Sequence, residues 1–261
     1  MSSAVGADVL LTRRSSRFVA WVRAWRAGLV PFDEVADQIA GDEEHLVADA
    51  PGTWTDVPLR EALPILSKVA PNDIRLVLPA PGDPRGLPGP GVFTDSALLA
   101  GEAVVAARLG FIPEVRRHTS GSGMTFETVH WRTYSLPPSA KRQTPPSPAE
   151  AEAELAATLA EATAELTRIG AAQWRPELSG ALATLRRPDA GADLPPGFDP
   201  RARRLFARAS MLDRVLALAE QVVPGGAVTG HEARRRDEVL RPLTTACRRA
   251  LMAACNAPLA P

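Results

Sequence analysis

The stretch that decides the fold of this chain is FIPEVRRHTSGSGMTFETVHWRTYSL, at positions 111–136. Two runs rich in β-branched and aromatic residues flank the short polar segment SGSG, a pattern typical of a β-hairpin. A symmetric four-residue turn places Arg116 opposite Glu127, and in this register His118 and His130 are not cross-strand neighbours. The sequence therefore predicts a hairpin near the middle of the chain.

A third strand is expected before this hairpin. In DIRLVLP (73–79), Ile74, Leu76 and Leu78 alternate with other residues, and this period of two places them on one face of a strand. The Ala-rich segment at 94–108 has the apolar spacing of a helix. Together these segments predict a small sheet of about three strands with helices on one face.

Helical patterns fill the first 70 residues. In SRFVAWVRAWRAGLV (16–30) apolar residues recur every three or four positions, which predicts a helix with one apolar stripe. A second helix is expected in PFDEVADQIAGDEEHLV (31–47), where acidic residues occupy the first turn. A third, short helix is expected around residues 59–69.

A Pro-rich segment separates two regions of different character. PPSAKRQTPPSP (137–148) contains five prolines and no apolar periodicity, which is typical of a linker. Amphipathic periodicity then recurs in four segments, and this predicts an antiparallel helical bundle. We therefore expect an α+β fold with an α+β module at 1–136, a linker at 137–148 and an all-α helical bundle at 149–261.

The charge of the chain is balanced, with 30 basic and 30 acidic residues. A neutral chain exerts no overall electrostatic attraction on nucleic acids or anionic membranes. Arginine outnumbers lysine 28 to two, a bias that the codons of a GC-rich genome produce. Clusters of arginine are therefore weak evidence of phosphate binding in this chain.

Cysteine usage and hydropathy indicate the compartment. Cys247 and Cys255 are eight positions apart in a helical pattern, and a separation of about 12 Å is too long for a disulfide. No N-terminal signal pattern is present, and no apolar run is long enough to cross a bilayer. We therefore expect a soluble cytoplasmic protein.

A segment with four prolines and four glycines, PGDPRGLPGPG (81–91), lies between the predicted strand and the helix that follows it. A Gly-rich turn before a helix is the layout of an anion site. The glycine motifs of nucleotide-binding proteins are absent, however, and proline lacks the N–H group that such a site uses. A stiff exposed loop can instead present side chains to a partner protein. The partner-binding candidates are Asp83, Arg85 and Leu87, and a plain connector is the alternative.

The sequence contains no short motif of catalysis or metal binding. Its four histidines show neither i, i+4 pairing nor the Cys/His spacing of a zinc site. The nucleophile motif G-x-S-x-G is absent as well. We expect no metal, no cofactor and no identifiable catalytic residue. The alternative is an enzyme without a short motif, with Arg85, Arg117 or His130 in its pocket.

Two further groups of residues are binding candidates. Trp21 and Trp25, with arginines interleaved, suit a partner-binding hot spot, although a stripe at this spacing is more often part of a core. Arginines recur on two C-terminal segments and would form one positive face if these segments were adjacent. The nucleic-acid-binding candidates are Arg201, Arg204, Arg208, Arg234, Arg235 and Arg236.

These observations favour a non-enzymatic cytoplasmic adaptor or regulatory protein that binds another protein. The two-module layout and the stiff loop support this interpretation. The partner is a protein of unknown identity, and the helical bundle is a second contact surface or a dimer surface that would make the chain a homo-oligomer. Nucleic-acid binding through the C-terminal arginines is the alternative, and no membrane partner is expected.

Overall fold

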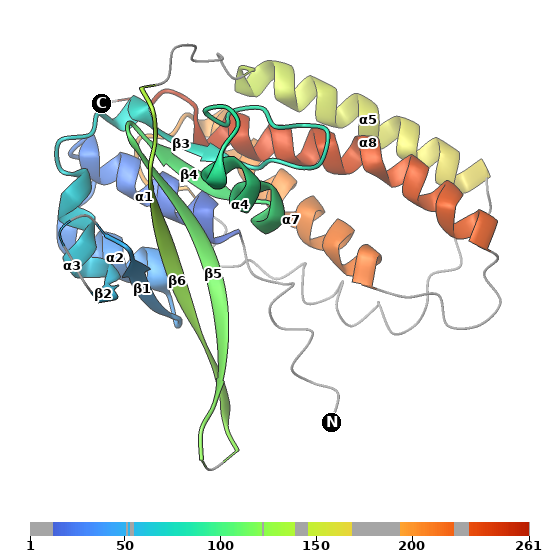
Figure 1. The fold of residues 1–261 in the computed structure, drawn as a ribbon. Coiled ribbons are helices and arrows are strands. Elements are labelled where there is room, and N and C mark those ends of the chain that lie inside the picture. The colour runs from blue at the N-terminus through green and yellow to red at the C-terminus, as the bar shows by residue number, and fades with distance from the viewer. Residues whose placement is uncertain are drawn as a thin grey trace. The chain divides into compact units, whose positions relative to one another are not determined.

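A computed structural model describes residues 13–50, 52, 55–121, 123–138, 146–168, 194–221 and 230–260. The chain forms two compact units, a sheet unit and a helical unit, and each is described on its own. The elements in Figure 1 are α1 (Arg14–Arg26), α2 (Phe32–Ala40), β1 (Glu44–Ala48), β2 (Val57–Pro58), α3 (Leu59–Ala62), the 3-10 turns η2 (Leu63–Leu66) and η3 (Pro71–Asp73), β3 (Ile74–Val77), α4 (Val92–Ala100), β4 (Ala103–Ala106), β5 (Leu109–Thr119), β6 (Thr125–Ser135), α5 (Pro148–Arg168), α7 (Pro200–Gln221) and α8 (Gly230–Cys255).

The described part of the sheet unit contains one sheet of six strands in the order β2-β1-β6-β5-β4-β3. β1 and β6 run parallel, and every other pair of neighbours runs antiparallel. The hairpin and the strand at β3 are present, but the prediction of about three strands is wrong, because β1, β2 and β4 complete a larger sheet.

Two of the additional strands occupy segments for which helices were expected. α2 ends at Ala40, where Gly41 adopts a φ of +57°, and the next segment EHLVA forms β1. α4 ends at Ala100, where Gly101 is left-handed, as is common at helix ends, and the buried segment AVVA forms β4. A short apolar run does not distinguish a helix from a buried strand. Pairing with neighbouring strands decides the outcome here.

α1 packs on one face of the sheet. The ring of Phe18 lies 5.5 Å from the ring of Phe111 in β5 and 4.7 Å from the ring of Trp131 in β6. All three side chains are buried. Because aromatic side chains bury large areas, these contacts form a main part of the core between α1 and the sheet.

α4 packs on the opposite face. Ile112 follows Phe111 in β5 and so points to the other side, where it joins a buried cluster with Phe93 and Ala97 of α4. Gly110 lies beneath the Phe93 ring and leaves room for it, since a Cβ at this position would lie 2.4 Å from a ring atom. The expectation that helices cover only one face of the sheet is therefore wrong.

Two short segments from later in the chain also belong to the sheet unit, Leu194–Asp199 and Pro258–Pro261. Phe198 and Leu259 form an antiparallel bridge between them. The guanidinium of Arg23 in α1 lies 5.7 Å from the centre of the Phe198 ring. After the Pro-rich segment, the chain thus returns to the sheet unit twice.

In the helical unit, α8 packs against both α5 and α7. Many of the buried side chains are alanine, and the Cys247 thiol donates to the Ala209 carbonyl at 3.1 Å between α8 and α7. Cys247 and Cys255 are both buried thiols. The second of the four predicted helices, at 177–187, lies outside the described residues. Among the helices that are described, none combines the length and the apolar character of a membrane span.

Candidate functional site

The hairpin β5–β6 extends past its neighbours in the sheet. β4 pairs with β5 only as far as Phe111, and β1 pairs with β6 only from Thr128 onward. Figure 1 shows the outer part of the hairpin projecting as a two-stranded ribbon. Residues 114–130 are called the arm below. The even-numbered side chains of its strands form the even face, and the odd-numbered ones form the odd face.

The register of the hairpin differs by one residue from the prediction. Arg117 lies opposite Glu127, and Arg116 lies opposite Thr128. The predicted pairing of Arg116 with Glu127 is therefore wrong. A shift of one residue moves a strand's side chains to the other face. His118 consequently shares the even face with His130.

The turn explains the shift. The N–H of Ser120 donates to the carbonyl of Met124 at 2.8 Å. Gly123 adopts a left-handed φ of +82°. The loop therefore consists of three residues closed by the Ser120–Met124 pair, a common hairpin connection that ends in a left-handed glycine. A symmetric SGSG turn would have four loop residues, so the observed loop is one residue shorter.

A chain of hydrogen bonds runs along the even face. Oγ1 of Thr128 lies 2.9 Å from Nε2 of His118 and 3.1 Å from Nε2 of His130. Nδ1 of His130 lies 2.9 Å from Oδ2 of Asp56. An ionised carboxylate only accepts hydrogen bonds, so Nδ1 of His130 carries the hydrogen. With His130 neutral, Thr128 donates to it and accepts from His118.

This order of groups resembles the acid–histidine–hydroxyl relay of hydrolases, but Thr128 is not placed as a nucleophile. The residue is 4% exposed, and two imidazole rings already bind its oxygen. The chain is thus suited to hold the two rings in position. The two histidines are not cross-strand neighbours, as expected, because His118 lies opposite Phe126 and His130 lies opposite Glu114. The shared hydroxyl of Thr128 links them.

The outer end of the chain supports an exposed aromatic ring. His118 and Phe126 stack with their ring centres 5.1 Å apart and their planes 19° apart. Phe126 is 51% exposed. Among the described residues six large apolar side chains are exposed, and the arm carries three of them, Val115, Met124 and Phe126. The arm is therefore an apolar projection whose even face holds one ring in a defined orientation.

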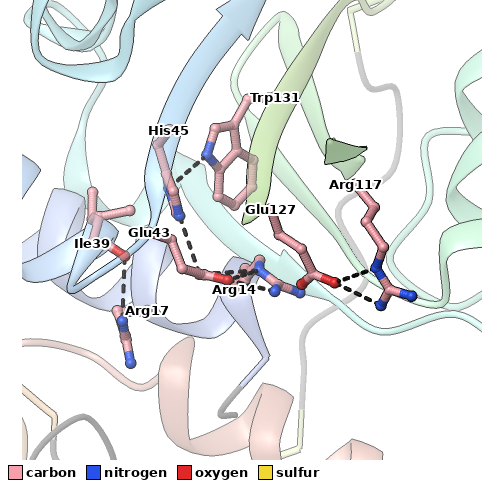
Figure 2. A network of polar contacts seen from close by, with 8 residues as sticks. All are labelled: Arg14, Arg17, Ile39, Glu43, His45, Arg117, Glu127 and Trp131. Carbon is pink, nitrogen blue, oxygen red and sulfur yellow. Dashed lines mark hydrogen bonds and ion pairs between the residues drawn. The ribbon is translucent and has the colours of Figure 1, made fainter. Parts of the chain in front are cut away.

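The odd face carries charges that bind each other. Arg117 donates to Oε1 of Glu127 from Nε at 3.0 Å and from Nη2 at 2.7 Å, as Figure 2 shows. Val115 lies on this face as well, on the same strand as Arg117. The cation on the odd face thus has a hydrogen-bonded acidic partner within the arm.

A buried network begins where the odd face enters the sheet (Figure 2). The indole N–H of Trp131 donates to Nδ1 of His45 at 3.1 Å, and Nε2 of His45 lies 3.3 Å from Glu43. Arg14 of α1 donates to the same carboxylate at 3.1 Å. Burial alone would raise the pKa of Glu43, but hydrogen bonds from His45 and Arg14 outweigh burial and lower this pKa to about 2. The network joins α1, β1 and β6.

The structure places the predicted loop candidates close to the sheet. Nε of Arg85 donates to Asp83 at 2.7 Å, so these two candidates bind each other. Leu87 packs against the buried cluster that contains Phe93. A Cβ at Gly86 would lie 3.2 Å from the side chain of Val77. The loop is thus folded against the sheet unit, and partner binding through it stays a prediction.

The two tryptophan candidates lie on α1 and are both half-buried. The ring of Trp25 lies 5.3 Å from the ring of Phe32, and the guanidinium of Arg26 lies 5.2 Å from the centre of the Trp25 ring. Trp21 and Trp25 therefore keep part of their surface accessible, and their role in partner binding stays a prediction.

The arginine candidates lie in the helical unit. Arg201, Arg204 and Arg208 are exposed at spacings that place them on one side of α7. Nε of Arg201 lies 3.4 Å from Glu152 of α5. Arg234 is exposed on α8, and the side chains of Arg235 and Arg236 lie outside the described part of the chain. Nucleic-acid binding through these residues stays a prediction.

Comparison with known proteins identifies the family. Residues 15–150 match the model described as Rv1486c-like protein, N-terminal domain, and residues 149–252 match the model described as its C-terminal domain. The chain belongs to the Rv1486c-like family. The boundary between the two family models falls at the start of α5.

Relatives of similar length occur in mycobacteria. The uncharacterized protein Rv1486c of Mycobacterium tuberculosis H37Rv is 28% identical over 273 residues, which cover 91% of this chain and 94% of the relative. The uncharacterized protein ML1804 of Mycobacterium leprae is 26% identical over 291 residues, with the same coverage. No solved structure matches the chain.

The sequence analysis did not identify Asp56, Thr128 and Phe126 as members of one site. His118, Phe126, Thr128 and His130 all have even numbers, so a hairpin loop with an odd number of residues places them on one face. The second glycine of SGSG was the available signal for such a loop, because glycine favours its left-handed last position.

Proposed function

We propose that this protein is a cytoplasmic adaptor or regulatory protein that binds another protein through the arm. The observation that supports this function is the stacked pair of Phe126 and His118. The Phe126 ring is 51% exposed, yet it rests on an imidazole that the Thr128–His130–Asp56 chain holds. An ordered aromatic side chain loses little conformational entropy when it binds.

The position of the ring also favours a binding role. Aromatic residues are enriched among the residues that contribute most to protein–protein binding. Phe126 lies in the projecting part of the hairpin, close to the turn that contains Met124, which is 72% exposed. A projecting ribbon can enter a groove of a partner without rearrangement of the sheet. In this proposal the helical unit provides a second contact.

An enzymatic role has less support from the same residues. Thr128 and His130 are buried, and each has hydrogen-bond partners in the chain along the even face. Of the other pocket candidates, Arg85 and Arg117 are about half-exposed and pair with acidic neighbours. The guanidinium groups of Arg85 and Arg117 are thus already bound to carboxylates of the same unit.

The proposal is tested by photocrosslinking in the native host. The full chain is expressed with p-benzoylphenylalanine in place of Phe126, and adducts are identified by mass spectrometry after illumination. The expected result is a small set of covalent protein adducts. The reactive group replaces one aromatic ring with another, so the arm keeps its shape.

Leu99 provides the control position. It lies on α4 of the same unit and is 91% exposed, so the reactive group is at least as accessible there. We expect the adducts from position 126 to be absent at position 99. The same adducts at both positions, or no adduct at position 126, would contradict the proposal.

A further inference from the structure

The even face contains a cation, Arg116, and each acidic residue near it forms a shorter contact with another residue. Arg116 lies 3.9 Å from Asp56 and 3.9 Å from Glu114, and both distances exceed that of a hydrogen bond. Asp56 binds His130 at 2.9 Å, and Glu114 binds Arg132 at 3.3 Å. The guanidinium of Arg116 is thus placed to donate to an incoming acceptor.

The accessibility and chemistry of Arg116 agree with this role. Its side chain is 47% exposed. A guanidinium donates in a planar fork that matches the two oxygens of a carboxylate. Arg117, the next residue, has comparable exposure but already donates twice to Glu127. A ligand carboxylate that binds Arg117 would therefore displace an existing hydrogen bond, whereas one that binds Arg116 would not.

Arg116 and the exposed aromatic pair lie next to each other. His118 is two residues further along β5, on the same face, and Phe126 lies directly opposite His118. Two residues of a strand span about 7 Å. A partner that binds both features therefore needs an apolar side chain and a carboxylate at about this separation.

The acidic residues of this region argue against a polyanionic partner. Asp56 and Glu114 lie within 4 Å of Arg116, and Asp49 lies 3.8 Å from Arg132. These carboxylates would repel the successive phosphates of a nucleic acid. A single carboxylate of a protein segment, with an apolar neighbour on Phe126, avoids most of this repulsion.

We infer that the even face of the arm is the partner-binding face and that it fits a protein segment with an apolar side chain about 7 Å from a carboxylate. This inference rests on the proposed function. Phe126 contacts the apolar side chain, Arg116 binds the carboxylate, and the chain from His118 to Asp56 keeps the aromatic ring in position.

The test is a selection of displayed random 12-residue peptides on the immobilised full chain. The affinities of the enriched peptides, made synthetically, are then measured for the wild type and four variants. Arg116→Gln and Phe126→Ser alter the even face. Arg117→Gln and Val115→Ser make the matched changes on the odd face. Circular dichroism checks that each variant is folded.

The expected peptides carry Asp or Glu within four positions of a large apolar residue. Arg116→Gln and Phe126→Ser are each expected to weaken binding by about tenfold or more, because each removes a direct contact. The odd-face variants are expected to change affinity less than about twofold. Together these results would support the inference.

Other outcomes overturn it in distinguishable ways. If Phe126→Ser abolishes binding but Arg116→Gln does not, or if the peptides lack acidic residues, the partner chemistry is wrong and the proposed function stands. If no enriched peptide depends on the arm, both are wrong. A random 12-nucleotide single-stranded RNA that binds the wild type and loses affinity with Arg116→Gln would assign the face to nucleic acid.

Discussion

The two faces of the arm use similar residues in different ways. Arg117 on the odd face binds Glu127, and the same face enters the core through Trp131. Arg116 on the even face lies at the longer distance of 3.9 Å from each acidic neighbour, and Phe126 lies in solvent on a supporting imidazole. The odd face thus attaches the hairpin to the unit, whereas the even face remains available for binding.

The largest expected difference between the faces comes from Trp131. We expect Trp131→Ala to lower the free energy of unfolding of the sheet unit by about 3–5 kcal/mol, because it leaves a cavity against Phe18 and removes the donor to His45. Phe126→Ala should change it by about 0.5 kcal/mol or less. Urea unfolding followed by circular dichroism measures both, and similar losses would contradict the assignment of the faces.

The second effect concerns the hydrogen-bond chain of the even face. Thr128→Val removes the hydroxyl between the two imidazoles and leaves Nε2 of the buried His130 without this hydrogen-bond partner. We expect a loss of about 1–3 kcal/mol and greater mobility of the Phe126 ring, measured by NMR relaxation of its aromatic carbons. Thr128→Ser keeps the hydroxyl and serves as the control. An unchanged ring in the valine variant would show that the chain does not position Phe126.

The third effect is a pH dependence of the odd-face network. The pKa of Glu43 is about 2 in the folded protein, below its ordinary value of 4.5. The carboxylate therefore stabilises the fold fully above pH 4.5, and this contribution is lost as the pH falls toward 2. We expect Glu43→Gln to remove stability on the order of 1–2 kcal/mol at pH 6 and little at pH 2. A difference between variant and wild type that does not change with pH would contradict this assignment.

The smallest expected effect is the difference in the free energy of unfolding between variants of the two adjacent arginines. Arg117→Gln breaks an exposed ion pair and should lower the free energy of unfolding by about 0.5 kcal/mol or less. Arg116→Gln should lower it by still less, because both of its contacts are longer than hydrogen bonds. Thermal unfolding at low salt measures the loss of stability in both variants. A larger loss for Arg116→Gln would indicate that this arginine has a structural role.

The sequence predicted the hairpin and the strand at β3 because their signals are local. Alternating apolar residues and a glycine-containing turn lie within one short stretch. The same reasoning failed at β1 and β4, where short apolar segments follow a helix without a change of composition. Glycines at positions 41 and 101 were the available signals, since both end their helices with a positive φ.

The candidate site depends on details that local patterns do not contain. Asp56 binds His130 from a loop far away in the sequence. The parity of the hairpin register decides whether His118 shares a face with His130, and one additional residue in the turn reverses it. Both histidines were considered from the sequence, but neither was recognised as part of the support for an exposed ring.

The sequence by itself determined the helical character of α1 and of the C-terminal region, the hairpin, and the absence of short catalytic motifs. Periodicity and turn residues encode these features within neighbouring positions. Only the tertiary structure decided the six-stranded order, the parallel pairing of β1 with β6, and the difference between the two faces of the arm. These depend on pairing between distant segments, because the burial and hydrogen bonds that stabilise them arise only after the segments meet.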